Sequence, residues 1–347
     1  MQLGLTFNDV LLVPKRNIVS SRSDVDTTTQ LTRNRTLGIP LLGASMDTVT
    51  EAGMAIALAR EGGLGIIHRF LTVEEEVAEV KKVKDQQLLV GAAIGINGDY
   101  FQRVDALVAA GADVLSLDVA HGHADDVIIA VQAIKKKYPS VDLIVGNVAT
   151  AVGAKDLIDA GADAIKVGVG PGSTCTTRVV TGAGVPQLTA IMDCATVCIP
   201  AGIPLIADGG IQTSGDIAKA LTAGASSVMC GNVFAGTDEA PGILIEMNRR
   251  KFKLFRGMAS RSATVDYYKK NGDSMGFEKL IMPEGVQAMV EYKGSVRDIV
   301  QKLVAGLRSG ISYCGAKDIL SMRKNAEFIR ITEAGYKESL PHHVEFS

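Results

Sequence analysis

Eight short apolar runs alternate along the chain with longer amphipathic stretches, and this rhythm limits the folds open to it. The runs are hydrophobic on both faces, which is typical of strands buried in a parallel sheet. They lie at 41–45, 64–68, 88–94, 114–119, 143–148, 164–169, 204–208 and 227–231. The stretches between them, at 51–61, 73–84, 100–110, 124–137, 151–160, 187–198 and 215–223, are long enough to form crossover helices.

Eight strand–helix units predict a TIM (β/α)8 barrel, with a doubly wound sheet as the alternative. Because a barrel of this kind needs about 250 residues, the 347 residues leave room for insertions within one catalytic domain, 1–347. The segment 237–290 lacks the rhythm, and we expect it to form a mobile flap. The last barrel helix should start after Ser295, with a tail from Ile311 to Ser347.

Charge and composition exclude several classes of protein. Lys and Arg number 36 against 38 Asp and Glu, a net charge of −2, which argues against binding along nucleic acid. No apolar run reaches the roughly 18 residues that cross a bilayer, and no signal peptide is evident at the start, so we expect a cytoplasmic protein without a membrane partner. Five cysteines without a framework predict reduced thiols.

The segment that follows the sixth run, at about 168–186, is the clearest candidate for a catalytic loop. In a TIM barrel the active site forms where the strands end, and Gly168, Gly170 and Gly172 would let backbone N–H groups approach an anion there. Cys175 lies in this loop near Arg178, which we expect to stabilise a thiolate. The spacing is not that of a classical dinucleotide fingerprint. The other cysteines, Cys194, Cys198, Cys230 and Cys314, are expected to be inert.

These motifs resemble the IMP dehydrogenase/GMP reductase family over essentially the whole chain. The resemblance rests on Gly-Pro-Gly-Ser-Thr-Cys-Thr-Thr-Arg at 170–178, Met-Asp-Thr-Val at 46–49, Asp-Gly-Gly-Ile at 208–211 and Pro-Glu-Gly at 283–285. It implies that Cys175 attacks C2 of a purine nucleotide to give a thioimidate, and that Thr177 and Glu284 relay a proton.

The resemblance also implies the remaining contacts. Ser173, Gly210 and Gly231 would hold the 5′-phosphate and Asp208 the ribose, while Asp118 and Asn147 would face the nicotinamide. Further substrate-side residues are Ser45, Met46, Gly209, Asn232, Gly257, Met258 and Ala259, and further cofactor-side residues are Arg69, Ala120 and Gly168. Backbone carbonyls of Gly170, Gly172 and Cys175 could hold K⁺ with Glu338, Ser339 and Leu340 of a neighbouring subunit in a homotetramer; alternatively the tail only packs.

The family contains two main reactions, and three features of this chain favour the reductive one. Dehydrogenases usually carry CBS modules, which this chain lacks, and they activate water with an Arg-Tyr pair that the segment 262–269 does not contain. Phe255 stands where dehydrogenases usually have a phosphate-contacting Tyr. We therefore expect NADPH-dependent conversion of GMP to IMP and ammonia. The alternatives are NAD-dependent oxidation of IMP to XMP, and a nucleotide-binding protein without turnover.

Overall fold

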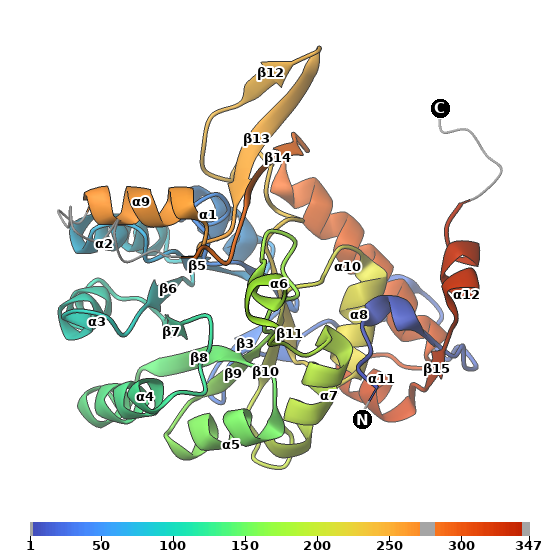
Figure 1. The fold of residues 1–347 in the computed structure, drawn as a ribbon. Helices are drawn as coiled ribbons and strands as arrows, with labels where there is room; N and C mark the ends of the chain where they lie inside the picture. Colours follow the sequence, from blue (N-terminus) through green and yellow to red (C-terminus); the bar gives the residue numbers. More distant parts are fainter. Residues whose placement is uncertain (1–2, 271–281, 342–347) are drawn as a thin grey trace.

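Eight parallel strands close into a barrel in a computed structural model that describes residues 3–270 and 282–341 (Figure 1). They are β4 (Leu41–Gly43), β5 (Leu64–Ile67), β6 (Gly91–Ile94), β7 (Val114–Asp118), β8 (Asp142–Val148), β9 (Ala164–Val167), β10 (Leu205–Asp208) and β11 (Ser227–Cys230). β11 pairs with β4, with Val228 opposite Leu41, and this pairing closes the sheet. The barrel prediction is confirmed, and the doubly wound alternative is wrong because that sheet would stay open.

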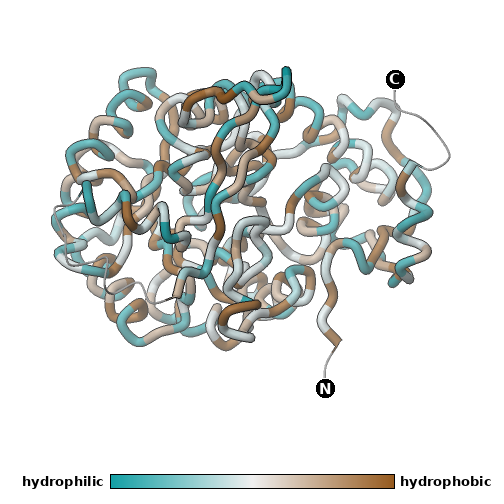
Figure 2. Tube along the Cα trace, turned by 45° about the horizontal axis from the view of Figure 1, so that its top comes forward, coloured by the Kyte–Doolittle hydropathy of each residue, from teal (hydrophilic) through white to brown (hydrophobic). Residues whose placement is uncertain are grey.

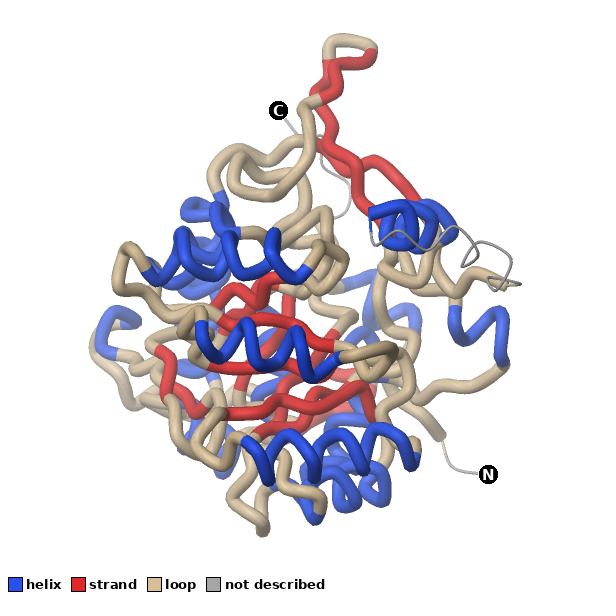
Figure 3. Tube along the Cα trace, turned by 90° about the vertical axis from the view of Figure 1, so that its left-hand side faces the viewer, coloured by secondary structure: helices blue, strands red, loops and turns tan. Residues whose placement is uncertain are grey.

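Helices surround the strands and cover their outer faces (Figures 1 and 3). They are α1 (Ala52–Arg60), α2 (Val73–Lys84), α3 (Tyr100–Ala109), α4 (Asp125–Lys137), α5 (Ala151–Asp159), α7 (Gln187–Cys198), α8 (Ser214–Thr222) and α10 (Val296–Tyr313). Several begin at a threonine cap; in α2, Thr72 and Glu75 form a capping box. Hydrophobic and hydrophilic residues alternate along the helices in Figure 2, because one side of each packs on the barrel. None of the helices in the described part of the chain is long and apolar enough to span a membrane.

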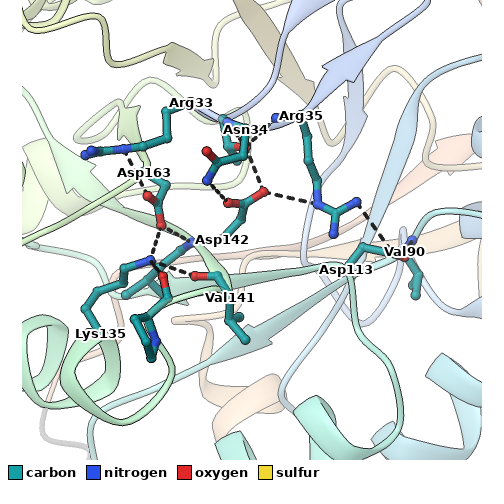
Figure 4. Close-up of polar contacts among 12 residues, drawn as sticks. Arg33, Asn34, Arg35, Val90, Asp113, Lys135, Val141, Asp142 and Asp163 are labelled. Carbon is teal, nitrogen blue, oxygen red and sulfur yellow. Dashed lines mark hydrogen bonds and ion pairs between the residues drawn. The ribbon is translucent and has the colours of Figure 1, made fainter.

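The N-terminal end of the barrel is closed by a hairpin made of β2 (Thr29–Gln30) and β3 (Thr36–Leu37). Leu31 and Leu37 are buried with the side chains that fill the barrel interior. Figure 4 shows the polar contacts of the hairpin loop. Asp142 accepts from Asn34 Nδ2 at 2.6 Å and pairs with Arg35 Nε at 3.1 Å, while Arg33 Nε lies 3.0 Å from Asp163 Oδ1. Since this is the end of the barrel opposite the expected active site, we assign the network to stability.

The insertion expected at 237–290 lies between β11 and α10 and projects from the barrel (Figure 3). It forms an antiparallel sheet of β12 (Ile245–Met247), β13 (Arg250–Arg256) and β14 (Gln287–Glu291), with α9 (Arg261–Lys270) beside it. The part at 271–281 lies outside the described residues. The expected mobility of this segment stays a prediction.

The C-terminal segment is tied to the start of the chain. α10 continues to Tyr313, so the tail begins later than the expected Ile311, and it contains α11 (Ile319–Asn325), β15 (Phe328–Arg330) and α12 (Glu333–Glu338). β15 pairs antiparallel with β1 (Val10–Leu12). α12 packs against the 3-10 turn η1 (Phe7–Asp9). This packing places the tail along the side of the barrel.

Candidate active site

A cavity of about 1180 Å³ opens at the ends of the barrel strands where an active site was expected. Its walls come from the segments that follow the strands and from the insertion. All the residues expected from the sequence to contact substrate or cofactor line it. Those expected to contact the substrate are Ser45, Met46, Ser173, Asp208, Gly209, Gly210, Gly231, Asn232, Gly257, Met258 and Ala259. Those expected to contact the cofactor are Arg69, Asp118, Ala120, Asn147 and Gly168. The structure thus brings these residues together; their individual roles stay predictions.

Cys175, Thr177 and Glu284 form a continuous polar chain in the cavity wall. Cys175 Sγ lies 3.2 Å from Thr177 Oγ1, and Thr177 Oγ1 donates to Glu284 Oε2 at 2.7 Å. All three residues line the cavity. A thiol connected through a hydroxyl to a carboxylate can form a covalent bond and move a proton in one place.

Backbone hydrogen bonds bring Glu284 to the cysteine loop across more than a hundred residues of sequence. Thr176 N–H donates to Glu284 O at 2.9 Å, and Val286 N–H donates to Thr174 O at 2.9 Å. Cys175 and Gly285 face each other in an antiparallel bridge. The carboxylate therefore keeps its position relative to the thiol through the main chain.

Arg178 is held by two carbonyl groups of its own loop, and its expected effect on a Cys175 thiolate stays a prediction. Its Nε donates to Val169 O at 3.1 Å and its Nη2 to Val185 O at 2.5 Å. Arg178 lies on α6 (Thr177–Thr181), and its guanidinium joins the two ends of the cysteine loop. We conclude that Arg178 shapes the loop, because its donors are directed at carbonyl groups rather than at the sulfur.

Arg256 connects the insertion to the barrel beside the cavity. Its Nε and Nη2 donate to Asp47 Oδ2 at 2.9 and 2.5 Å, and its Nη1 donates to Asp266 Oδ2 at 2.8 Å. Asp47 follows β4, and Asp266 lies on α9. This fork holds the segment Gly257–Ala259 over the loop that carries Ser45 and Met46.

Lys166 on β9 connects three of the expected site residues, and sequence reasoning missed it. The side chain is 1% exposed, and its Nζ donates to Asp118 Oδ1 at 2.8 Å, to Asp208 Oδ2 at 2.7 Å and to Asn147 Oδ1. Burial opposes the positive charge, but the two carboxylates outweigh burial and raise the pKa of Lys166. A lysine inside the apolar run Ala164–Val167 was the available signal, since a buried lysine needs a partner.

Lys166 also affects the ionisation of Asp118, which with Asn147 and Asp208 forms the floor of the cavity. Burial alone would raise the pKa of Asp118, but Lys166 and a hydrogen bond from Ser45 Oγ at 2.6 Å hold that pKa below its usual value. Asn147 Nδ2 donates to Asp208 Oδ2 at 2.9 Å and to Gly168 O at 2.7 Å. Asp118 and Asp208 therefore present oriented carboxylates that suit ribose hydroxyl groups.

Substituting Gly168 with alanine should distort the site, because a Cβ there would lie 2.0 Å from Asp208 O and φ is +153°. We expect the free energy of unfolding to fall by about 3 kcal/mol. Gly182→Ala is the matched control: φ is +71° but nothing lies within 4 Å of its Cβ position, so about 1 kcal/mol is expected. Urea denaturation of both variants measures the difference, and equal losses would refute the steric explanation.

The proposed potassium site is only partly assembled within one chain. Gly170, Gly172 and Cys175 line the cavity, whereas Glu338, Ser339 and Leu340 are not among its lining residues. The latter lie on and after α12, which is at the right-hand edge of the molecule in Figure 1, away from α6 of the cysteine loop. No group of three His, Cys, Asp or Glu side chains suited to a metal occurs within 3–270 and 282–341. The cation site stays a prediction that needs a second subunit.

Three aromatic side chains line the cavity near Arg69, and their contacts with one another were not expected from the sequence. Phe70, Tyr267 and Tyr268 line it. The rings of Phe70 and Tyr267 have centroids 5.0 Å apart, and the Arg69 guanidinium lies 5.2 Å from the Phe70 centroid. α9 thereby contacts the loop after β5. No local pattern pointed to this contact, because it joins segments about two hundred residues apart.

A family model described as IMP dehydrogenase / GMP reductase domain matches residues 4–342. The chain belongs to this family. Its members are oxidoreductases of purine metabolism that use a nicotinamide cofactor, and the barrel carries the motifs that suggested the resemblance. The oxidoreductase assignment is thereby confirmed at the level of the family.

Relatives with both activities are similar to the chain. An inosine-5′-monophosphate dehydrogenase of Nitrosopumilus maritimus is 42% identical over 98% of this chain and 98% of its own. A GMP reductase of Leishmania donovani is 38% identical over 98% of this chain and 97% of its own. The solved structure of a cysteine-to-alanine variant of Trypanosoma brucei GMP reductase, in complex with guanosine 5′-monophosphate, is 36% identical, with a TM-score of 0.94 over 99% of both chains.

The lengths of these alignments bear on the missing CBS modules. The two sequence alignments run over 468 and 478 positions, more than the 347 residues of this chain. Relatives of either activity therefore carry residues without a counterpart here. The missing modules consequently do not discriminate between the two reactions.

Proposed function

We propose that this oxidoreductase is a GMP reductase, converting GMP and NADPH to IMP, ammonia and NADP⁺ in purine nucleotide interconversion. One observation carries the choice: the whole insertion at 237–290 contains no Arg followed by Tyr. Its arginines, Arg249, Arg250, Arg256 and Arg261, precede Arg, Lys, Gly and Ser. Because the dehydrogenase reaction needs that pair to activate water, the hydrolytic step lacks its base here.

The proposed chemistry begins at Cys175. Its thiolate adds to C2 of GMP, and Glu284, through Thr177, delivers the proton with which the 2-amino group leaves as ammonia. The cavity then holds a thioimidate between Sγ and C2. Bound NADPH supplies the hydride that reduces C2, after which the C2–S bond breaks and IMP departs with the Cys175 thiolate restored. The geometry supports this proton transfer, since the Cys175 sulfur, the Thr177 hydroxyl and the Glu284 carboxylate are in contact.

Substituting Glu284 with glutamine should lower kcat for GMP reduction by about 10²-fold. The amide keeps the size of the side chain but cannot carry the proton to the leaving amine. We expect KM for GMP to change little, because Glu284 contacts Thr177 rather than the expected phosphate or ribose positions. Steady-state kinetics measure both constants. A rise in KM at unchanged kcat would assign Glu284 to binding instead.

The proposal also includes a site for NADPH and a homotetrameric quaternary structure. Asp118, Asn147 and Arg69 would face NADPH in the same cavity, and the Phe70 ring offers a surface for stacking. We propose a cytoplasmic homotetramer in which Glu338, Ser339 and Leu340 of the partner subunit complete a K⁺ site with Gly170, Gly172 and Cys175. The donors in such a site would be backbone carbonyls, which suit a hard monovalent cation.

IMP dehydrogenase is the second candidate, because four relatives named inosine-5′-monophosphate dehydrogenase are 38–43% identical to this chain. Chromatography separates the two reactions. GMP with NADPH should yield IMP, and IMP with NAD⁺ should yield no XMP. Formation of XMP would establish the dehydrogenase, and no product from either pair would favour a nucleotide-binding protein without turnover.

A further inference from the structure

Two lysines lie at one end of the cavity, beside the residues expected to hold a phosphate. Lys293 and Lys302 both line it, and both are exposed. Among the described lining residues the only other cation is Arg69, whose guanidinium lies 3.3 Å from the Cβ position of Gly95, after β6. β6 is on the far side of the barrel from β10 and β11. The lysines therefore provide the positive charge at the Gly210 and Gly231 end.

Lys293 is fixed on the turn that follows β11. Its Nζ donates to Asn232 O at 2.5 Å and to Val233 O at 3.3 Å. The Gly231 carbonyl accepts from Phe234 N–H and Ala235 N–H, at 3.1 and 2.9 Å. Within the described chain, the Asn232 backbone N–H has no such acceptor of its own. Since its carbonyls are held, the turn keeps this donor available to an anion.

Lys302 reaches the cavity because α10 packs closely along α8, its neighbour in Figure 1. A Cβ on Gly306 would lie 2.1 Å from Ser214 Oγ, and one on Gly310 would lie 3.1 Å from Ala218 Cβ. Lys302 is one turn before Gly306 on this face of α10. Because Ser214 is the first residue of α8, the lysine extends past the start of α8 toward the turn 210–212, which also lines the cavity.

The charge on Lys302 has no partner in the described part of the chain. It makes neither a hydrogen bond nor an ion pair with residues 3–270 or 282–341. An exposed lysine can remain unpaired in water, but this one lines the same cavity as Asn232, whose backbone N–H has no acceptor among the described residues. The combination suits a dianion better than a neutral ligand.

Phe255 lacks the hydroxyl group with which a tyrosine at this position could contact the phosphate. The ring is 2% exposed, and its Cζ lies 3.9 Å from the Cβ position of Gly231. A tyrosine would carry its hydroxyl at this end of the ring, whereas phenylalanine donates nothing. The positive charge of a lysine would offset the missing donor.

We propose that Lys302 pairs with the 5′-phosphate of the bound purine nucleotide, and that Lys293 is a positioning residue that holds the Gly231–Asn232 turn against the same phosphate. This inference rests on the proposed function only for the ligand class, a purine nucleoside monophosphate. It applies equally to GMP reduction and to IMP oxidation. Lys302 contributes to affinity and not to the chemical step.

Calorimetric titration with GMP and with guanosine tests the pairing, because guanosine lacks only the phosphate. Lys302→Ala should weaken GMP binding about five- to tenfold and leave guanosine binding unchanged. Lys302→Arg should stay close to wild type. Lys136→Ala, which removes an exposed lysine of α4 outside the cavity lining, is the matched control and should change neither affinity. An unchanged GMP affinity in Lys302→Ala, or an equal loss for both ligands, would overturn the assignment.

Lys293→Met should lower the GMP-to-guanosine affinity ratio in the same way, and Lys293→Arg should restore it. A ratio that stays at the wild-type value would remove Lys293 from the proposal. Repeating the titrations with IMP and inosine separates this inference from the proposed reaction. A phosphate effect with both nucleotides supports the pairing whichever reaction is catalysed, whereas wild-type protein that binds neither nucleotide would refute both proposals.

Discussion

Substituting Cys175 with alanine is expected to abolish GMP reduction, lowering kcat by about 10⁴-fold or more. The substitution removes the sulfur that bonds to C2, while Thr177 and Glu284 keep their backbone positions through the bridge between Cys175 and Gly285. GMP binding should therefore remain measurable. Initial rates and calorimetric titration of the same preparation give both quantities.

The control for this variant is Cys194→Ala. Cys194 is fully buried on α7, and burial raises its pKa, so it stays a neutral thiol. Burial likewise raises the pKa of Cys198 to about 12. We expect Cys194→Ala to retain turnover. Residual activity of Cys175→Ala near that of this control would exclude the covalent mechanism.

Substituting Lys166 with methionine is expected to lower the free energy of unfolding by about 3 kcal/mol at pH 8. The variant leaves Asp118 and Asp208 charged at the cavity floor without their cation. The side chains of the two aspartates are 25% and 21% exposed, so water screens part of this cost. Because Lys166 no longer orients the two carboxylates, nucleotide binding should also be weaker.

The effect of Lys166→Met on the free energy of unfolding should depend on pH. In the wild type the pKa of Asp118 is lowered, so its contribution to stability is present above the ordinary value of 3.8 and is lost as pH falls through the lowered value. Between pH 8 and 5 it stays constant. Without Lys166, burial raises the pKa of Asp118 instead, and the folded protein then gains stability as the pH falls toward 5.

Urea denaturation at pH 8 and pH 5 therefore tests the role of Lys166. The deficit of Lys166→Met relative to wild type should be smaller at pH 5. Lys155→Met is the control, because Lys155 pairs with Asp159 on the surface, with both side chains 58% exposed, and should cost at most about 0.5 kcal/mol. A deficit that is the same at both pH values would show that Lys166 acts through packing and not through charge.

The barrel could be predicted because its signals are local. Buried parallel strands are apolar on both faces, and each crossover helix is amphipathic, so the expected helices begin and end within one residue of those observed. The position of the site follows from the fold, since the strand ends of a barrel converge. The cluster of Cys175 with Asp208 and Asn147 around one cavity was thus accessible from sequence.

Contacts between distant segments could not be predicted. Lys166 pairs with carboxylates 48 and 42 residues away, and only the closed barrel brings them together. β13, with the sequence Arg-Lys-Phe-Lys-Leu-Phe-Arg, is a charged segment whose strand conformation depends on β14. The hydrogen-bond partners of Arg178 could not be predicted for a related reason. Proximity in sequence placed its charge beside Cys175, but the fold directs it to carbonyl groups of the same loop.

Absorbance at 340 nm tests the proposed reaction most directly, followed on wild-type protein with GMP and NADPH and, in parallel, with IMP, NAD⁺ and K⁺. We expect the absorbance to fall in the first mixture, with one ammonia released per NADPH consumed, and to stay constant in the second. A rise in the second mixture alone would mean that a group other than an Arg-Tyr pair, such as Arg261 or Tyr267, activates water. The protein would then be a dehydrogenase.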